Sequence, residues 1–145
     1  MDIDEIEEKI RKYRPLNETI SKACSVGRYL IDTYFSEVPY SKKRKRWEIE
    51  FFYNNIEFIT RKWVMEIIWE LETHKGLNFN ELKRNIKKIS ARALSDRLKE
   101  LEESDIISRT VQDTRPPTVL YQLSEKGKGF IELMIVVILF LKNMY

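Results

Sequence analysis

The residue types that could bond a nucleic acid gather in the second half of the chain. Arg92, Ser95 and Lys99 follow one another at helical spacing, and Arg97 flanks that row. Arginine can donate two hydrogen bonds to a guanine edge, and serine can bond either bases or phosphates. The spacing therefore predicts a helix whose outer row could contact the major groove of DNA.

Further cations on both sides of this row suit contact with DNA phosphates. The residues that we expect to contact DNA are Lys87, Lys88, Ser90, Arg92, Ser95, Arg97, Lys99, Arg109 and Arg115. Residues 75–128 carry a net positive charge, whereas residues 1–40 carry a net negative one. This polarity favours a DNA-binding second half. On charge alone, the same cations fit a solvated helix surface equally well.

The sequence contains no suitable set of residues for catalysis or for metal binding. The sequence contains a single histidine, His74, and a single cysteine, Cys24, which excludes an ordinary Cys/His zinc site and an intramolecular disulfide. Carboxylates are plentiful but follow helix-surface patterns, and there is no glycine-rich phosphate loop. We therefore expect no enzymatic activity, no metal and no cofactor. Because Cys24 lies on an apolar stripe, we expect it to be a packed thiol.

The elements that must position the candidate residues are two helices joined by a turn. Leu94, Leu98 and Leu101 repeat at the spacing of a buried helix face, in a helix that Ser90 would cap. A shorter helix is expected at 81–86, with Asn78 or Asn80 as its cap, and a short strand at 77–79. The turn between the two helices contains Lys87 and Lys88.

Two β-rich segments follow, at 106–112 and 118–123, separated by a turn that contains Pro116 and Pro117. Ser124 is expected to cap a last helix. A helix, a short strand, two further helices and a two-stranded hairpin form the order of a winged helix. We therefore predict a mainly α fold with a small β-hairpin wing: a winged helix-turn-helix with added N- and C-terminal dimerisation helices.

The first part of the chain predicts additional helices. One is expected at residues 2–14, and a second begins at a cap at Asn17 and ends before Pro39. The run 42–46 is interpreted as a basic linker, with an extra DNA arm or a partner patch as alternatives. A further helix is expected at 47–71, with Gly76 as a C-terminal cap after it. The predicted domains are residues 1–46, 47–128 and 129–145.

The last helix carries an unbroken apolar run from Leu133 to Leu141. The run is much shorter than the roughly 20 residues that span a membrane. A helix that is apolar all round must be covered, and we expect a second subunit and the N-terminal helices to cover it. Burial within one chain and membrane association are the alternatives. The residues expected at this dimer interface are Phe130, Leu133, Met134, Val137, Ile138 and Leu141. The acidic N-terminus lacks a signal-peptide pattern, so a cytoplasmic protein is expected.

Four segments in the right order resemble one family of regulators. They are Arg61-Lys62-Trp63, Phe79-Asn80-Glu81-Leu82, the segment from Ile89 to Glu102, and the segment from Pro116 to Gly127. Over residues 61–130 the chain is similar to the HxlR-type winged-helix transcription regulators, which are relatives of the MarR type. Three features depart from the family pattern: Arg61 replaces a glycine, the first 45 or so residues are longer, and Cys24 lies far from the position of the sensing cysteine of some members.

This resemblance implies a homodimer that binds a pseudo-palindromic operator in double-stranded DNA. It implies that Ser90, Arg92, Ser95 and Arg97 face the major groove, and that Arg109 and Arg115 in the wing touch the backbone. Two other functions remain open at this point: a winged-helix module for protein interaction, and an architectural DNA-binding protein with little base preference. The sequence predicts neither the operator nor any small-molecule effector.

Overall fold

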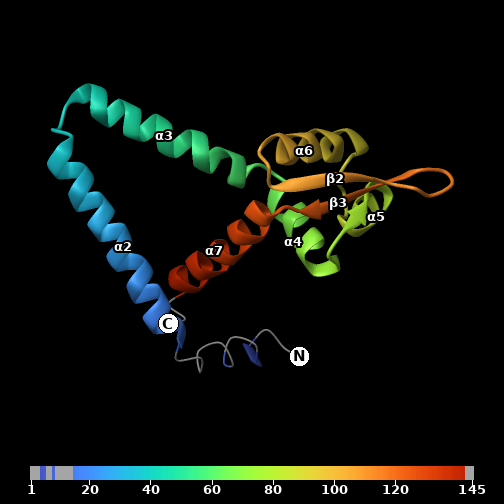
Figure 1. Ribbon diagram of the computed structural model, residues 1–145, viewed down its shortest axis with the longest axis horizontal. Helices are drawn as coiled ribbons and strands as arrows, with labels where there is room; N and C mark the ends of the chain where they lie inside the picture. The colour runs from blue at the N-terminus through green and yellow to red at the C-terminus, as the bar shows by residue number, and fades with distance from the viewer. Residues whose placement is uncertain (1–3, 6–7, 9–14, 143–145) are drawn as a thin grey trace. The chain divides into compact units, whose positions relative to one another are not determined.

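The computed structural model describes residues 4–5, 8 and 15–142, and the side chains from Glu18 onward within the last of these ranges. The helix expected at residues 2–14 therefore lies almost entirely outside the described residues. The elements are α2 (Pro15–Glu37), α3 (Lys42–Thr60), α4 (Val64–His74), β1 (Leu77–Asn78), α5 (Phe79–Asn85), α6 (Ala91–Glu103), β2 (Ile107–Gln112), β3 (Thr118–Leu123) and α7 (Glu125–Leu141) (Figure 1). The predicted mainly α fold with a small β-hairpin and additional N- and C-terminal helices is confirmed.

The chain forms two compact units. The winged-helix unit comprises Phe51–Glu132, and the terminal unit comprises Met1–Glu50 together with Leu133–Tyr145. Helices α3 and α7 each begin in one unit and end in the other. The two units are described separately.

The winged-helix unit is organised around one apolar core. The fully buried side chains at its centre are Val64, Ile67, Ile68, Leu71, Leu82, Ile89, Leu94 and Leu101. They come from α4, from α5, from the turn after α5 and from α6. Phe58, near the end of α3, and Trp63 are half-buried and pack against this core. Burial of this apolar surface is the main favourable contribution to the stability of the unit.

A three-stranded antiparallel sheet completes the unit, in the order β1-β3-β2. The pairing of Ile107 with Leu123 and of Gln112 with Thr118 sets the register of the β2–β3 hairpin. Helix α6 packs against β2, and α4 packs against β3. The far end of the hairpin projects beyond α5 and α6 (Figure 1). This hairpin is the wing.

Side-chain caps fix where the helices of this unit begin. Asn78 and Glu81 form a capping box, in which each side chain accepts a hydrogen bond from the backbone N–H of the other residue. The Ser90 hydroxyl accepts a bond from the N–H of Ala93 at 3.0 Å. The Ser124 hydroxyl accepts one from the N–H of Gly127 at 3.0 Å. The prediction of helix starts at these three positions is confirmed, with Asn78 rather than Asn80 as the cap of α5.

The single helix expected at 47–71 is wrong, because α3 and α4 are separate helices. The chain breaks at residues 61–63, where Trp63 precedes α4 in the left-handed conformation with φ 78°. Apolar periodicity continues across the break, so the sequence pattern did not reveal it. The cap at the end of α4 also differs from expectation: Lys75, not Gly76, occupies the left-handed cap position with φ 59°.

Gly127 brings the start of α7 against the body of the winged-helix unit. A Cβ atom at this position would overlap the carbonyl oxygen of Ile106. Gly129, one half-turn later, has open space around it. Only a glycine at position 127 therefore allows this close approach of backbone to backbone.

In the terminal unit, Arg44 holds the corner between α2 and α3. Its side chain is buried, donates from Nε to Glu48 at 2.8 Å and from Nη1 to the carbonyl of Val38, and lies over the rings of Tyr34, Phe35 and Tyr40. Partial burial, followed by the carboxylate of Glu48, raises the pKa of the Tyr34 hydroxyl. The corner is therefore built on one cation stacked among aromatic rings.

Two expectations about the first part of the chain are wrong. Residues 42–46 form the start of α3 rather than a linker. Helix α2 begins at Pro15, so Asn17 lies inside its first turn rather than at its cap. Proline suits the first turn of a helix because it needs no hydrogen bond from its nitrogen there.

The terminal unit leaves much of its apolar surface exposed. Leu133 and Leu141 on α7 are 70% and 73% exposed, and Tyr29 and Leu30 on α2 are similarly open. Of the buried apolar side chains, Ile20 alone among the described residues lies in this unit. Cys24 is exposed rather than packed, because α2 has few covering neighbours. Within the described residues, no helix is long and apolar enough to cross a membrane.

Candidate nucleic-acid interface

Helix α6 turns an apolar face inward and a polar face outward. Leu94, Leu98 and Leu101 are buried in the core of the winged-helix unit. On the opposite side of the helix, Arg92 is 93% exposed and Lys99 is 77% exposed at the side chain. Ser95 between them is also exposed. The predicted outer row therefore stands on one accessible face, available to a groove about 12 Å wide.

The cations of this outer row have acidic neighbours on the same helix. Arg92 lies 4.0 Å from Asp96, and Lys99 lies 3.8 Å from Glu103. Such exposed pairs at helical spacing contribute little, typically about 0.3–0.5 kcal/mol. They would therefore yield readily to a phosphate or to a base edge.

Arg97 is less accessible than the outer row. Its side chain is 23% exposed and forms an ion pair with Glu100. Glu100 also accepts a hydrogen bond from Arg61 at 3.0 Å, and Arg61 immediately follows α3. Arg97 therefore belongs to a small ion-pair cluster at the edge of α6, and contact with a DNA base would require that cluster to rearrange.

The turn before α6 presents two exposed lysines, Lys87 and Lys88. Lys88 adopts the left-handed conformation with φ 70°, which lets the chain reverse direction between α5 and α6. Ser90 ends the turn, and its oxygen caps α6 through the N–H of Ala93. The hydroxyl proton of Ser90 is not used in this cap and remains available to a phosphate oxygen.

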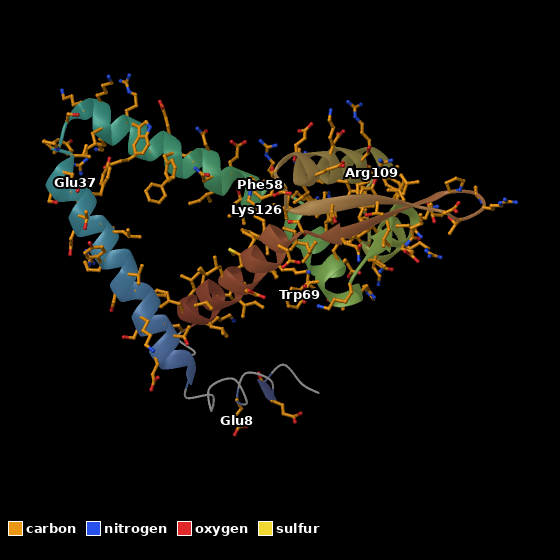
Figure 2. The ribbon with its side chains drawn as sticks, viewed as in Figure 1. Glu8, Glu37, Phe58, Trp69, Arg109 and Lys126 are labelled. Atoms are coloured by element: carbon orange, nitrogen blue, oxygen red, sulfur yellow. The ribbon has the colours of Figure 1, made fainter. Side chains whose placement is uncertain are left out.

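The wing carries Arg109 and Arg115, both of which are exposed. Arg109 lies on β2 opposite Tyr121 of β3 (Figure 2), and Arg115 lies in the loop at the end of the hairpin. Thr114 organises this loop: its hydroxyl oxygen accepts a bond from the N–H of Thr118 at 2.9 Å and lies 2.9 Å from the carbonyl of Pro116. The two arginines therefore stand at different distances along a hairpin that extends from the body.

All nine predicted contact residues thus belong to one compact unit, on α6, on the turn before it and on the wing. Eight of them are exposed, and Arg97 is half-buried. Within the described residues, no group of three or more His, Cys, Asp or Glu side chains is placed to hold a metal ion. The arrangement can therefore offer a row of hydrogen-bond donors and cations to a polyanion.

Sequence reasoning missed the residues that hold this face in place. Glu100 joins α6 to the chain before α4 through its contacts with Arg97 and Arg61. Lys126 ties the start of α7 to the carbonyl of Ser104 after α6, at 2.8 Å (Figure 2). The spacing of Arg97 and Glu100 was a visible signal for a helical ion pair. The other two contacts join distant parts of the chain and left no local pattern.

Of the six residues expected at a dimer interface, Phe130 lies in the winged-helix unit and the other five lie in the terminal unit. Phe130 is half-buried and packs against the core of the winged-helix unit, which its own chain provides. Val137 lines an apolar groove of about 250 Å³ in the terminal unit, together with Ile20, Ala23 and Cys24 of α2. Leu133, Val137, Ile138 and Leu141 are exposed, and Met134 is half-buried.

Two helices joined by a turn, with a hairpin after the second helix, define the winged helix-turn-helix class of DNA-binding domain. The family comparison agrees. The HxlR-like helix-turn-helix model matches residues 58–144, and the chain belongs to this family. The protein is therefore a transcription regulator with a helix-turn-helix DNA-binding domain, in a family that is generally non-enzymatic.

Relatives of known sequence or structure support the assignment. The chain is 33% identical over 99 residues to BH0655 of Halalkalibacterium halodurans, an HTH-type transcriptional regulator; the match covers 68% of this chain and 88% of that protein. It is 33% identical over 93 residues to MalR of Fusobacterium mortiferum, covering 64% and 85% of the two chains. The reduced form of the regulator YodB from Bacillus subtilis superimposes with a TM-score of 0.52 at 32% identity, covering 60% of this chain and 88% of that one.

Proposed function

We propose that the protein is a dimeric, sequence-specific regulator that binds double-stranded DNA, with α6 in the major groove and the wing against the neighbouring backbone. The observation that carries this proposal is the two-sided character of α6. Three buried leucines anchor it, while Arg92, Ser95 and Lys99 are open to solvent on its other face. Arg92 is placed to read bases, because it is almost fully exposed and has only a weak ion pair.

The remaining candidates have backbone roles in this proposal. Lys87, Lys88, Arg109 and Arg115 bind phosphates, and Ser90 donates its hydroxyl proton to a phosphate near the start of α6. Arg97 contacts DNA only if it leaves Glu100. Its substitution is therefore expected to have a smaller effect than that of Arg92.

A second copy of the chain is the proposed cover for the exposed face of α7. A symmetric dimer would bury apolar surface of Leu133, Ile138 and Leu141. Each Å² buried would contribute about 25 cal/mol of favourable free energy. A dimer also places two α6 helices on the two half-sites of a pseudo-palindrome, about one helical turn apart. The proposed location is the cytoplasm, where genomic DNA would be available to such a regulator.

Genomic footprinting followed by binding titrations tests this function. Footprinting with the full chain should recover a pseudo-palindromic sequence. In anisotropy titrations on that sequence, Arg92→Ala should weaken binding by about 1–3 kcal/mol and relax the preference for one base pair. Glu102→Ala, an exposed change on the same helix, is the matched control and should not weaken binding.

Three outcomes would contradict the proposal. Equal affinity for the recovered site and for random DNA would indicate an architectural protein. Capture of a stoichiometric protein partner, with no salt-sensitive DNA binding, would indicate an interaction module. Sedimentation equilibrium that gives a monomer at micromolar concentration would remove the dimer.

A further inference from the structure

The start of α3 carries a concentrated positive charge that the winged helix does not explain. Lys42, Lys43, Lys45 and Arg46 are all exposed within the first five residues of the helix. We call these four residues the basic turn. Side chains that end in nitrogen extend outward from this part of the helix (Figure 2). The matching family model begins only at residue 58, so the basic turn lies outside the part of the chain that it covers.

The basic turn differs from α6 because its cations do not form ion pairs with described residues. On α6, Arg92, Arg97 and Lys99 each have a carboxylate within ion-pair distance. None of the four cations of the basic turn forms an ion pair with any residue that the structure describes. Like charges four positions apart, such as those of Lys42 and Arg46, destabilise a helix slightly, so this arrangement does not favour the folding of α3.

Arg44 explains why the four cations share one outward face. It lies inside the same run of sequence but points in the opposite direction, into the corner, where Glu48 one turn later is its partner. Residues 42, 43, 45 and 46 fall on the other side of the helix because of the 3.6-residue period. The buried arginine therefore orients the basic turn. Because it pairs with Glu48, that carboxylate is not available to neutralise the four exposed cations.

An aromatic side chain accompanies these cations. Tyr40 is 71% exposed and lines a groove of about 570 Å³ with Lys42, Lys45 and Arg46. Its ring centroid lies 6.0 Å from the guanidinium carbon of Arg44, which holds it near the corner. The groove contains one carboxylate, Glu50. Exposed cations of this kind are typical of surfaces that bind nucleic acid, because they neutralise backbone phosphates.

We propose that the basic turn is a second DNA-contacting surface, which binds the phosphate backbone of a duplex in addition to the contacts made by α6 and the wing. This inference rests on the proposed function, because it takes DNA to be the polyanion. The basic turn contributes affinity without base specificity, since lysines bind phosphates as point charges. It therefore strengthens binding to the operator and to random DNA by the same factor.

The salt dependence of DNA binding tests this inference on the full chain. The probe is a fluorescein-labelled 40-base-pair duplex of random sequence, titrated by anisotropy at several NaCl concentrations. Each lost phosphate contact should reduce the slope of log affinity against log salt by about 0.9. Lys42→Gln/Lys45→Gln should therefore flatten the slope by about 1.8 for each bound chain and weaken binding at low salt.

A matched control removes the same charge elsewhere in the terminal unit. Lys22→Gln/Arg28→Gln changes two exposed cations on α2 and should keep the parental slope. Circular dichroism should show parental helix content for both double variants, because all four side chains are exposed. A slope for Lys42→Gln/Lys45→Gln equal to that of the parent would overturn the inference.

The test separates this inference from the proposed function. If Arg92→Ala weakens operator binding while Lys42→Gln/Lys45→Gln has no effect, the basic turn is not a DNA contact and the proposed function stands. If Arg92→Ala has no effect but the basic turn does, the second surface stands and the groove-reading role of α6 fails. Binding to phosphatidylglycerol vesicles that depends on Lys42 and Lys45, with unchanged DNA binding, would identify a lipid surface instead and overturn the inference.

Discussion

The winged-helix unit and the terminal unit use apolar residues in opposite ways. In the winged-helix unit, apolar side chains of α4, α5, α6 and the sheet meet in one closed core. In the terminal unit, α2 and the second half of α7 are at least as rich in apolar residues, yet Ile20 is the only buried one among the described residues. The first unit therefore has a closed core of its own residues, whereas the second leaves most of its apolar side chains exposed.

This difference shows which part of the molecule forms a closed apolar core within one chain. The family match and the proposed DNA-binding face both lie mainly in the unit with the closed core. The proposed dimer contacts and the basic turn both lie in the unit without one. In the proposed dimer, DNA recognition would belong to the unit with the closed core, and assembly would belong to the exposed helices of the other unit.

A leucine-to-alanine substitution in each unit should give the largest difference between the two units. Leu94→Ala removes a fully buried side chain from the core and should lower the free energy of unfolding by about 2–5 kcal/mol. Leu133→Ala removes a side chain that is 70% exposed and should leave the unfolding of the winged-helix unit unchanged. Its effect should instead be a higher dimer dissociation constant. Urea denaturation and sedimentation equilibrium measure the two effects, and equal destabilisation by both variants would contradict the division.

A pair of glycines on α7 tests where the closed core ends. Gly127→Ala places a methyl group against the backbone of Ile106 and should destabilise the winged-helix unit by about 1–3 kcal/mol. Gly129→Ala has open space and should stabilise the helix by about 0.5–1 kcal/mol. Thermal unfolding of both variants gives the measurement. A neutral result for Gly127→Ala would mean that α7 does not approach Ile106 closely.

Two serine caps give the smallest contrast. Ser90 caps α6 and Ser41 caps α3, and each accepts a backbone hydrogen bond at 3.0 Å. Ser90→Ala should lower the free energy of unfolding of the winged-helix unit by about 1 kcal/mol. Ser41→Ala should reduce helix content in the terminal unit without changing the unfolding midpoint of the other. Hydrogen exchange, resolved by peptide, separates the two responses. Protection lost in α6 on Ser41→Ala would show that the units are not independent.

Local chemistry explains how much of this structure could be predicted. Asn78, Ser90 and Ser124 marked helix starts because a capping side chain bonds a backbone N–H within three residues. The leucines of α6 marked its inward face because the helical period is fixed. Strands β2 and β3 were found within one residue because prolines cannot join the ladder between them.

The errors fall where long-range contacts override the local pattern. The break at Trp63 lies inside a continuous apolar pattern, and packing of that ring against the core accompanies the left-handed turn. The basic residues 42–46 were interpreted as a linker because they follow the helix that Pro39 was expected to end. In the structure they begin α3, where Arg44 pairs with Glu48 and lies over three aromatic rings in the corner.

The sequence by itself determined the class of the fold, the family and the outward row of α6, because helical period, caps and turn residues act over a few positions. Only the tertiary structure decided which of the candidate cations are accessible. It placed Arg97 in a cluster with Glu100 and Arg61, and it oriented the basic turn by burying Arg44. The reason is physical: side-chain accessibility depends on neighbours that the fold brings from distant positions, and no local pattern records them.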